Sequence, residues 1–266
     1  ARLIEEVLAG FIADETRRAG RSRVVVGLSG GIDSAVAAAL ARRALGAAGV
    51  IGVMMPYRLS DPTSVTHARD LARRLRFRTE TFDISPMVDA WFASDSAASR
   101  VRKGNKMARE RMSILYDRSV VHDALVLGTS NKTELLLGYG TVFGDMASAL
   151  NPLGDLYKTQ VRQLAAQLKI PPVIRRKPPS ADLWAGQTDE KDLGITYDLV
   201  DRLLYLLVDE RATREDAVRA GWPARQVDRV LARVRASQHK RRPPLIAKIS
   251  SRTVGVDFRY PRDWGT

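Results

Sequence analysis

Residues 29–34, Ser-Gly-Gly-Ile-Asp-Ser, combine the small and acidic side chains that phosphate chemistry requires. Because glycine leaves the backbone unobstructed, the N–H groups of the first three residues can turn toward one anion at the positive end of a helix. Asp33 could hold a magnesium ion on bound phosphates, and the Ser34 hydroxyl could add a hydrogen bond. The pattern predicts a phosphate-binding loop, although an ordinary strand-to-helix turn uses the same glycines.

The residues on either side indicate which elements must position this loop. The valines at 24–26 predict a strand buried on both faces, and a helical spacing follows at Ala35, Val36, Ala39 and Leu40. The loop has no lysine in the Walker position, and the sequence has no G-x-G-x-x-G pattern, so two commoner phosphate motifs are excluded.

Strand and helix patterns alternate along the first two thirds of the chain. Strands are predicted at residues 24–26, 50–55, 77–84 and 124–127, and helices at 2–19, 63–75, from about 86, 106–116 and 157–168. Residues 95–105 predict a flexible connection, 138–155 a long loop on the ligand side, and 170–194 a proline-rich excursion that orders with ligand. Three more helices are expected at 196–209, 213–220 and 224–238.

This alternation favours one α/β domain over residues 1–266. Parallel strands joined by right-handed helical crossovers give a doubly wound, mostly parallel sheet flanked by helices. The C-terminal part, about 196–240, is helical. The helix at 2–19 precedes the first strand, so it is expected at a sheet edge or at a partner subunit.

The composition excludes several classes of protein. No apolar run approaches the ~20 residues of a membrane span, and the acidic residues of the first helix argue against a secretory signal, so a cytoplasmic protein is expected. The absence of cysteine excludes disulfides, thiolate zinc sites and a cysteine nucleophile. The net charge of +13 suits RNA, a dinucleotide or ATP, but most arginines fall on expected solvated helix faces, which disfavours nucleic acid as partner.

Several segments resemble known families. The string SGGIDS resembles the pyrophosphate-binding loop of the N-type ATP pyrophosphatases, which split ATP into AMP and pyrophosphate. Over nearly the whole chain, five segments together resemble ammonia-dependent NAD synthetase: residues 104–112, 128–139, 151–165, 177–198 and 237–242. This resemblance implies an adenine nucleotide alpha hydrolase-like fold.

The resemblance also implies a reaction. The carboxylate of deamido-NAD attacks the α-phosphorus of ATP and expels pyrophosphate, and ammonia then displaces AMP from the mixed anhydride. A carboxylate is a poor acceptor for an amine, whereas its adenylate carries a good leaving group. Charge develops on the departing pyrophosphate, so magnesium, a lysine and loop N–H groups must already surround it.

Site residues are implied by motif position. The implied ATP contacts are Gly27, Leu28, Ser29, Gly30, Gly31, Ile32, Asp33, Ser34, Thr129, Lys158 and Ser180. Asp33 and Glu134 are the implied magnesium ligands, and Lys158 would stabilise the leaving charge, so that Lys158 and Asp33 are the catalytic pair. The implied contacts to deamido-NAD are Arg109, His239 and Lys240.

Each assignment has a simpler alternative. Lys158 could be a helix-face lysine, and Glu134 a carboxylate at a helix N-terminus. Arg109 could be an exposed helical arginine, and His239 with Lys240 could belong to the solvated basic run 239–242.

Two positions depart from the family pattern. The family has a lysine where this chain has Val142, and an aspartate that would fall at Ala149. Two polar contacts to the nicotinate-bearing half of the acceptor are therefore absent or supplied from elsewhere. We hypothesise that basic groups such as Arg175, Arg176 or the run 239–242 compensate.

The nitrogen source and the assembly are also implied. Glutamine-dependent relatives carry an additional amidase domain with a cysteine nucleophile, so ammonia is expected here. The resemblance implies a homodimer, for which the apolar residues Ile114, Leu115, Val120 and Val121 could provide a contact or else form core. Two rival readings are an RNA-modifying enzyme with the same loop and a nucleotide-binding regulatory module without catalysis.

Overall fold

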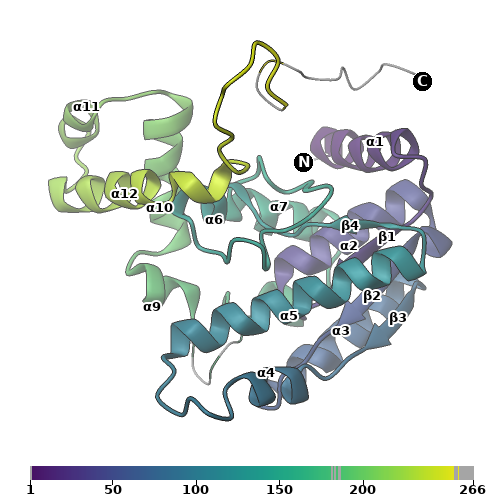
Figure 1. Ribbon diagram of the computed structural model, residues 1–266. Coiled ribbons are helices and arrows are strands. Elements are labelled where there is room, and N and C mark those ends of the chain that lie inside the picture. Colours follow the sequence, from purple (N-terminus) through teal and green to yellow (C-terminus); the bar gives the residue numbers. More distant parts are fainter. Residues whose placement is uncertain (1, 181, 183, 185–186, 255–256, 258–266) are drawn as a thin grey trace.

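A four-stranded parallel sheet forms the centre of the molecule (Figure 1). The computed structural model describes residues 2–180, 182, 184, 187–254 and 257. The strands are β1 (Val24–Gly27), β2 (Val50–Met54), β3 (Arg78–Thr81) and β4 (Leu125–Leu127), in the order β3-β2-β1-β4. Val24 pairs with Val50 on one side and with Leu125 on the other.

Helices alternate with these strands and then continue to the C-terminal region. They are α1 (Arg2–Arg18), α2 (Ile32–Leu45), α3 (Pro62–Leu75), α4 (Ser85–Trp91), α5 (Arg100–Val121), α6 (Lys132–Leu137), α7 (Lys158–Gln167), α8 (Pro172–Arg175), α9 (Asp189–Leu193), α10 (Tyr197–Leu204), α11 (Arg214–Arg219) and α12 (Ala224–Ala236). Helix α2 connects β1 to β2, and α3 connects β2 to β3. Helices α4 and α5 then return the chain to β4, which lies on the other side of β1. The expected doubly wound α/β fold is therefore confirmed.

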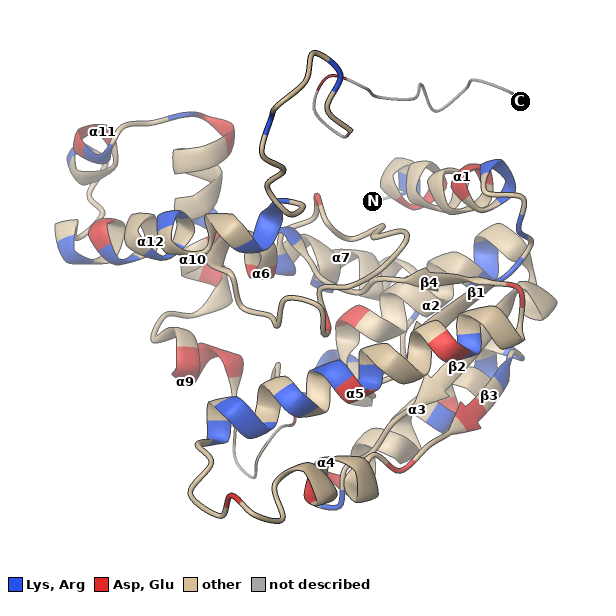
Figure 2. Ribbon diagram, viewed as in Figure 1, with Lys and Arg blue, Asp and Glu red and all other residues tan. Residues whose placement is uncertain are grey.

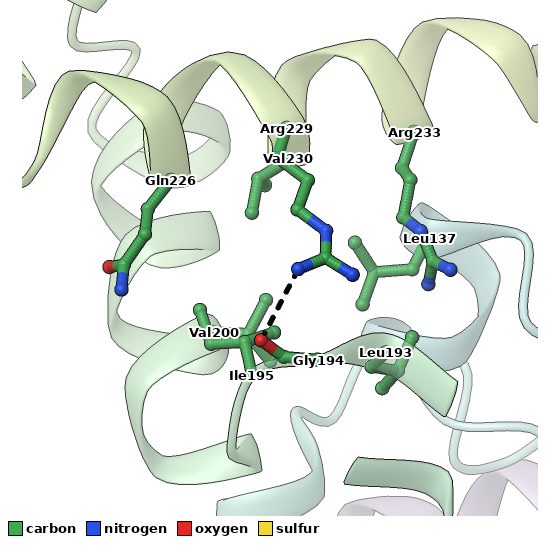
Figure 3. A pocket seen from close by; sticks show the side chains of 9 residues that line it. All are labelled: Leu137, Leu193, Gly194, Ile195, Val200, Gln226, Arg229, Val230 and Arg233. Atoms are coloured by element: carbon green, nitrogen blue, oxygen red, sulfur yellow. Dashed lines mark hydrogen bonds between the residues drawn. The ribbon is translucent and has the colours of Figure 1, made fainter. Parts of the chain in front are cut away.

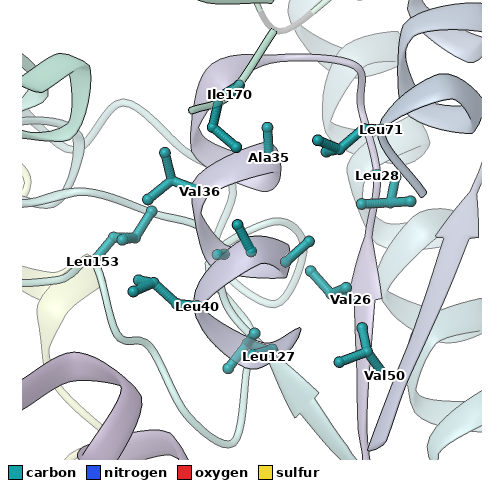
Figure 4. Packing of buried hydrophobic residues seen from close by; sticks show 14 of the residues in the cluster. Val26, Leu28, Ala35, Val36, Leu40, Val50, Leu71, Leu127, Leu153 and Ile170 are labelled. Atoms are coloured by element: carbon teal, nitrogen blue, oxygen red, sulfur yellow. The ribbon is translucent and has the colours of Figure 1, made fainter. Parts of the chain in front are cut away.

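The alternation within β1 divides the core between two faces of the sheet. Val24 and Val26 pack toward α2, in a layer that also includes residues of α1, α3 and α7 (Figure 4). Val25 points to the opposite face, where α4 and α5 cover it. Each large aliphatic side chain so buried contributes about 1.5–3 kcal/mol, and the alanines of α2 let neighbouring helices approach closely.

A third cluster lies away from the sheet, among the helices of the C-terminal region. Tyr197, Val200, Leu203 and Leu204 of α10 pack there with Val227 and Val230 of α12. Leu137 of α6 and Tyr157, the residue before α7, belong to the same cluster. The C-terminal helices therefore rest on the segment that follows β4. The three helices expected at 196–209, 213–220 and 224–238 are found, with a π-helical turn at Tyr205–Asp209.

Some expected boundaries were wrong. The segment 95–105 is not a flexible connection throughout, because α5 already begins at Arg100, after the cap Ser99, and continues to Val121. The strand expected at 77–84 is shorter, although Phe82 N–H still donates to Met54 O at 2.9 Å. No helix within the described residues is long and apolar enough to cross a membrane.

The four apolar residues of α5 that could form a dimer contact differ in how deeply they are buried. Ile114 and Leu115 are partly buried against the core beneath β1 and β2. Val120 and Val121 are 81% and 56% exposed. The first pair therefore contributes to the core, and only the second pair remains available for a subunit contact.

Asp61 stabilises the start of α3 and provides a test of the fold. Its carboxylate accepts from Thr63 Oγ1 at 2.7 Å and Thr63 N at 2.9 Å, and Lys177 Nζ lies 3.1 Å away. These hydrogen bonds, those from Thr63 first, lower the pKa of Asp61 to about 2.

We expect Asp61→Ala to lower the free energy of unfolding by about 1 kcal/mol at pH 7, because a helix cap is lost. The pKa of Asp61 is lowered by folding, so its contribution is present above the unfolded pKa and lost as the pH falls through about 2. Urea unfolding at pH 7 and below pH 4 measures this difference. An unchanged difference between wild type and variant down to pH 2 would contradict the assignment.

Candidate functional site

The candidate site lies where the strand order reverses. β1 and β4 are neighbouring parallel strands, so the loops that follow them leave the same edge of the sheet. After β1 the chain continues to β2 on one side of β1, whereas β4 lies on the other side. Open α/β sheets bind ligands at such a crevice. The loop after β1 contains residues 28–31, and the loop after β4 contains residues 128–131.

The Ser-Gly-Gly loop has the predicted open backbone at the start of α2. Gly30 has a φ of +74°, and a Cβ there would lie 2.3 Å from the carbonyl oxygen of Ser64. Gly31 is the N-cap of α2, and it has no side chain to accept from the N–H groups of the first turn. The N–H groups in the first turn of α2 therefore have no acceptor from the cap residue, which suits an anion site at a helix N-terminus.

The two serines of the loop shape it from inside. Ser34 Oγ donates to Gly31 O at 3.1 Å and accepts from Ser29 N–H at 3.3 Å, and Ser29 Oγ accepts from Gly31 N–H at 3.2 Å. Ser29 Oγ is 3.1 Å from Ser34 Oγ. The Ser34 hydroxyl, expected to bind phosphate, is thus bonded to the loop's own backbone.

Three predicted charged residues meet behind this loop. Lys158 Nζ lies 2.5 Å from Asp33 Oδ2 and 3.2 Å from Glu134 Oε1. Asp33 lies in the first turn of α2, Glu134 in α6, and Lys158 is the first residue of α7. The Lys158 side chain is only 2% exposed, so it is a buried ammonium between two carboxylates. The alternative of a solvated helix-face lysine is therefore wrong.

Neighbouring polar groups hold this trio in place. Asn131 Nδ2 donates to Asp33 Oδ1 at 3.0 Å, and the Asn131 side chain also caps α6. Glu134 Oε2 accepts from Asn131 N–H at 3.2 Å, which completes a capping box. Sequence reasoning missed Asn131, although the spacing Asn-x-x-Glu before an apolar run indicates such a box.

Charge and burial oppose one another at Lys158. Burial alone would lower the pKa of Lys158, but the carboxylates of Asp33 and Glu134 outweigh it, so this pKa is raised. Burial raises the pKa of Glu134 to about 8, against the opposing effect of Lys158. The Lys158 side chain therefore stays positively charged. When Asp33 and Glu134 are both ionised, the three side chains together are negatively charged.

The two carboxylates also fit the expected metal. Oxygen donors suit Mg²⁺, which is commonly held by one or two carboxylates together with substrate phosphates. Among the described residues there is no cluster of three or more acidic, histidine or cysteine side chains that could hold a metal ion. Asp33 and Glu134 would thus need phosphate oxygens and water to complete the coordination.

A segment after α8 reaches the phosphate loop from another direction. Lys177 Nζ donates to Ser64 Oγ at 2.8 Å, and Asp182 accepts from Asp61 N at 3.1 Å and Ser64 Oγ at 3.1 Å. Asp182 N–H in turn donates to Ser180 Oγ at 3.0 Å. Because Ser64 packs on Gly30, the predicted ATP contact Ser180 belongs to a segment anchored beside this loop.

The same segment continues to the far side of Lys158. The buried carboxylate of Asp189, at the start of α9, accepts from Tyr197 Oη at 3.0 Å and Tyr139 Oη at 3.1 Å. The Tyr197 ring lies beneath Lys158, with its centroid 5.0 Å from Nζ. Burial raises the pKa of Asp189 and of both tyrosines. Sequence reasoning found none of these three residues.

The predicted acceptor contacts surround the loop after α6. Arg109 Nη2 donates to the carbonyl of Val142 at 3.4 Å. Lys240 Nζ donates to the carbonyls of Gly138 and Gly140, at 2.8 Å each. His239 is exposed and contacts Ala236 O at 3.1 Å through Nδ1.

The remaining predicted residues are more scattered. Thr129 is half-buried in the loop after β4, and Ala149 is exposed, with its N–H donating to Val126 O at 2.9 Å. Arg175 Nε donates to Ile170 O at 3.0 Å, beside α7. The hypothesis that Arg175 or Arg176 replaces the missing acceptor contacts stays a prediction.

Basic side chains gather along the N-terminal half of α5, as Figure 2 shows. They are Arg100, Arg102, Lys103, Lys106 and Arg109. Arg109 contacts the loop at Val142, and Asn105 of α5 accepts from Thr141 Oγ1 at 2.8 Å. The loop that would face the acceptor is thus flanked by positive charge, which suits a phosphate-bearing ligand.

Residues 4–244 match the family model for NAD synthase. The chain belongs to the NAD synthase family. The NH(3)-dependent NAD(+) synthetase of Trichlorobacter lovleyi is 54% identical over 99% of this chain and 97% of that protein. The enzyme of that name from Chlorobium phaeovibrioides is 56% identical over 99% of this chain and 95% of its own length. The resemblance inferred from the motifs is confirmed.

Solved structures of this family have the same fold. The NMN synthetase of Francisella tularensis has a TM-score of 0.82 at 34% identity, over 92% of this chain and 98% of its own. The NH3-dependent NAD synthetase of Campylobacter jejuni, in complex with nitrate, has a TM-score of 0.79 at 33% identity over 93% and 98%. A glutamine-dependent NAD+ synthetase from Acinetobacter baumannii matches 97% of this chain with 49% of its own, at 32% identity and a TM-score of 0.70.

Membership of the NAD synthase family argues against the alternative of an RNA-modifying enzyme, which the sequence left open. The match covers the phosphate loop, the Lys158 trio and the basic run at 239–242, so it extends well beyond the phosphate loop alone. The individual roles of these residues stay predictions.

Gly30 provides a test of the phosphate loop. We expect Gly30→Ala to abolish ATP binding, because its Cβ would lie 2.3 Å from Ser64 O and 2.8 Å from Ser64 Cα, so the backbone must shift. Gly20→Ala is the matched control, since Gly20 has a φ of +69° but nothing within 4 Å of its Cβ.

Both variants bear the strain of a positive φ, about 1 kcal/mol or more. Only the Gly30 variant should lose nucleotide affinity, measured by calorimetry with ATP and magnesium. Equal ATP affinity of the two variants would show that the close approach of Gly30 to Ser64 does not matter for nucleotide binding.

Proposed function

We propose that this NAD synthase family member amidates deamido-NAD to NAD with ammonia and ATP, through an adenylated carboxylate, releasing AMP and pyrophosphate. It is thus a ligase that forms a carbon–nitrogen bond. The observation that carries the proposal is the convergence of Lys158, Asp33 and Glu134 behind a glycine loop at a helix N-terminus. The identity of over 50% to proteins named NH(3)-dependent NAD(+) synthetase supports it.

The geometry suggests how these residues would act on ATP. The N–H groups at the start of α2 would bind the pyrophosphate that leaves, and those of Ser29 and Gly31 would join them by releasing the loop hydroxyls. Lys158 would neutralise charge that develops on the pyrophosphate. Lys158 is fixed by Asp33, Glu134 and the Tyr197 ring, so its position is set before the reaction and costs no reorganisation. Thr129 and Ser180 would contact the remainder of the nucleotide.

Magnesium would be held by Asp33 and Glu134, together with phosphate oxygens of ATP. When bound, it would supply charge neutralisation on the phosphates. Asn131 would orient Asp33 through its hydrogen bond of 3.0 Å. The metal would also favour the ionised form of Glu134, since burial raises the pKa of this carboxyl to about 8.

The acceptor would bind beside the loop after α6. Arg109 and the run that contains His239 and Lys240 flank this loop at either end. Ammonia would attack the adenylate there. Two copies of the chain would form a homodimer, with Val120 and Val121 as candidate contacts, as they are exposed on α5.

A coupled assay tests this function. Purified protein is supplied with ATP, magnesium and ammonium, together with deamido-NAD, and NAD formation is measured. Nicotinate mononucleotide replaces deamido-NAD in a second reaction, because a similar structure is an NMN synthetase. Glutamine replaces ammonium in a third reaction. Failure of deamido-NAD to react, or no pyrophosphate release at all, would overturn the proposal, and the latter result would favour a regulatory module.

Asp33→Asn tests the proposed metal ligand. We expect NAD formation to fall by about 10²–10³-fold, the loss typical of removing one transition-state contact, while Glu134 still pairs with the buried Lys158. Asp155→Asn is a matched control, because Asp155 also pairs with a lysine, Lys132 at 3.2 Å, but its side chain is 96% exposed. Equal losses in both variants would argue against a special role of Asp33.

Val142→Lys tests how the missing acceptor contact is replaced. If other basic groups compensate, introducing lysine leaves the Michaelis constant for deamido-NAD unchanged, and we expect this result because Arg109 already reaches the backbone at 142. Steady-state kinetics with deamido-NAD as the varied substrate measures it. A large decrease of the Michaelis constant would mean that the contact is absent rather than replaced.

A further inference from the structure

Two arginines on α12 hold the end of α9. Arg229 Nη1 donates to the carbonyl of Gly194 at 3.4 Å, and Arg233 Nη2 donates to the carbonyl of Asp192 at 3.3 Å. Figure 3 shows both side chains descending from α12 toward the turn that contains Leu193, Gly194 and Ile195. Their spacing of one helical turn places both guanidinium groups on the same side of α12.

The turn itself is shaped for this contact. Gly194 is the C-cap of α9 with a φ of +67°, and a Cβ there would lie 2.5 Å from the Arg229 guanidinium. The last carbonyls of a helix have no partner within the helix, so they require donors from elsewhere. Arg229 and Arg233 provide these donors, and Leu193 is buried beside them among residues of α10 and α12.

The pairing has an electrostatic cost that these contacts offset. Burial, and then the charge of Arg229, lower the pKa of Arg233, whereas Asp192 acts in the opposite direction. Two like charges one turn apart repel one another. The carbonyls at 192 and 194 lie where they compensate this repulsion, so both arginines contact the end of α9 although Arg229 is exposed.

The other end of α9 leads directly to the catalytic lysine. Asp189, four residues before Leu193 at the end of α9, binds the hydroxyl of Tyr197, whose ring lies beneath Lys158. Gln187 and Tyr139 add hydrogen bonds of 3.0 Å and 2.9 Å to Asp192. The position of α9 therefore determines the position of Asp189, and through Tyr197 the support of Lys158.

We infer that Arg229 and Arg233 are positioning residues for the amidation reaction, which act by fixing α9 so that Asp189 and Tyr197 hold Lys158. The expected effect on kcat rests on the proposed function, whereas the expected effect on the position of α9 does not. Neither arginine touches the site itself: Arg229 acts on Asp189 through residues 190–193, and Arg233 acts on it through residues 190 and 191.

The test uses the full chain with Arg229→Ala, Arg233→Ala and the double variant. We expect the amides of residues 189–194 to exchange hydrogen at least about fivefold faster in the double variant, since their anchor is lost. With ATP, magnesium, ammonium and deamido-NAD, kcat should fall about tenfold or more, as for a displaced catalytic group. The Michaelis constant for ATP should change much less, because the phosphate loop is intact.

The control is Arg225→Ala, which removes an exposed arginine one turn earlier on α12. It should leave both the exchange at 189–194 and kcat at wild-type values. Arg233→Lys should restore part of kcat, since an ammonium can still donate to the carbonyl of Asp192. Such rescue is not expected if the arginines only stabilise the fold.

Unchanged exchange at 189–194 in the double variant would overturn the inference, and so would a local increase in exchange without any loss of kcat. If the double variant unfolds, Arg229→Ala alone decides, because its side chain is exposed. If the wild-type protein forms no NAD, the proposed function fails, but the exchange measurement still tests whether the arginines fix α9.

Discussion

The site depends on one buried ammonium that is neutralised by carboxylates from distant parts of the chain. Asp33 and Lys158 are separated by 125 positions in sequence, yet Nζ and Oδ2 are 2.5 Å apart. Removing one partner of a buried ion pair typically costs about 3–5 kcal/mol, because an uncompensated charge is left behind. The elements that carry these side chains, α2 and α7, pack in one layer and must therefore keep their mutual positions.

The packing around the trio explains how that position is maintained. The backbone N–H of Lys158 donates to Thr133 Oγ1 at 3.0 Å, and this hydroxyl donates to Asp201 Oδ1 at 2.6 Å. Thr159 N–H also donates to Asp201, at 2.7 Å. The start of α7 is thus fixed to α6 and to α10 at once, so the C-terminal helices support the same lysine that the sheet loops surround.

The sequence predicted the parts of this arrangement that local patterns encode. The glycine loop, the strands at 24–26 and 124–127 and the C-terminal helices were found because apolar periodicity and glycine placement are local properties. The start of α5 was missed because residues 100–105 lack an apolar stripe. The Ser99 cap stabilises the start of this helix, and burial of Gly104 places the segment against the core; neither is evident from composition.

The support beneath Lys158 could not be predicted, because it depends on tertiary contacts of ordinary residues. Asp189, Tyr139 and Tyr197 have no spacing that distinguishes them from solvated side chains or core aromatics, yet their hydroxyl and carboxylate groups meet within 3.1 Å. The family resemblance identified residues that would touch ligands, but not those that hold the ligand-binding residues in place. A buried charge needs such a surrounding set of hydrogen bonds, because the low-dielectric interior strengthens both the ion pair and the penalty for leaving any member unpaired. The residues that contact the buried groups of a charged site therefore determine its geometry, even where no sequence pattern marks them.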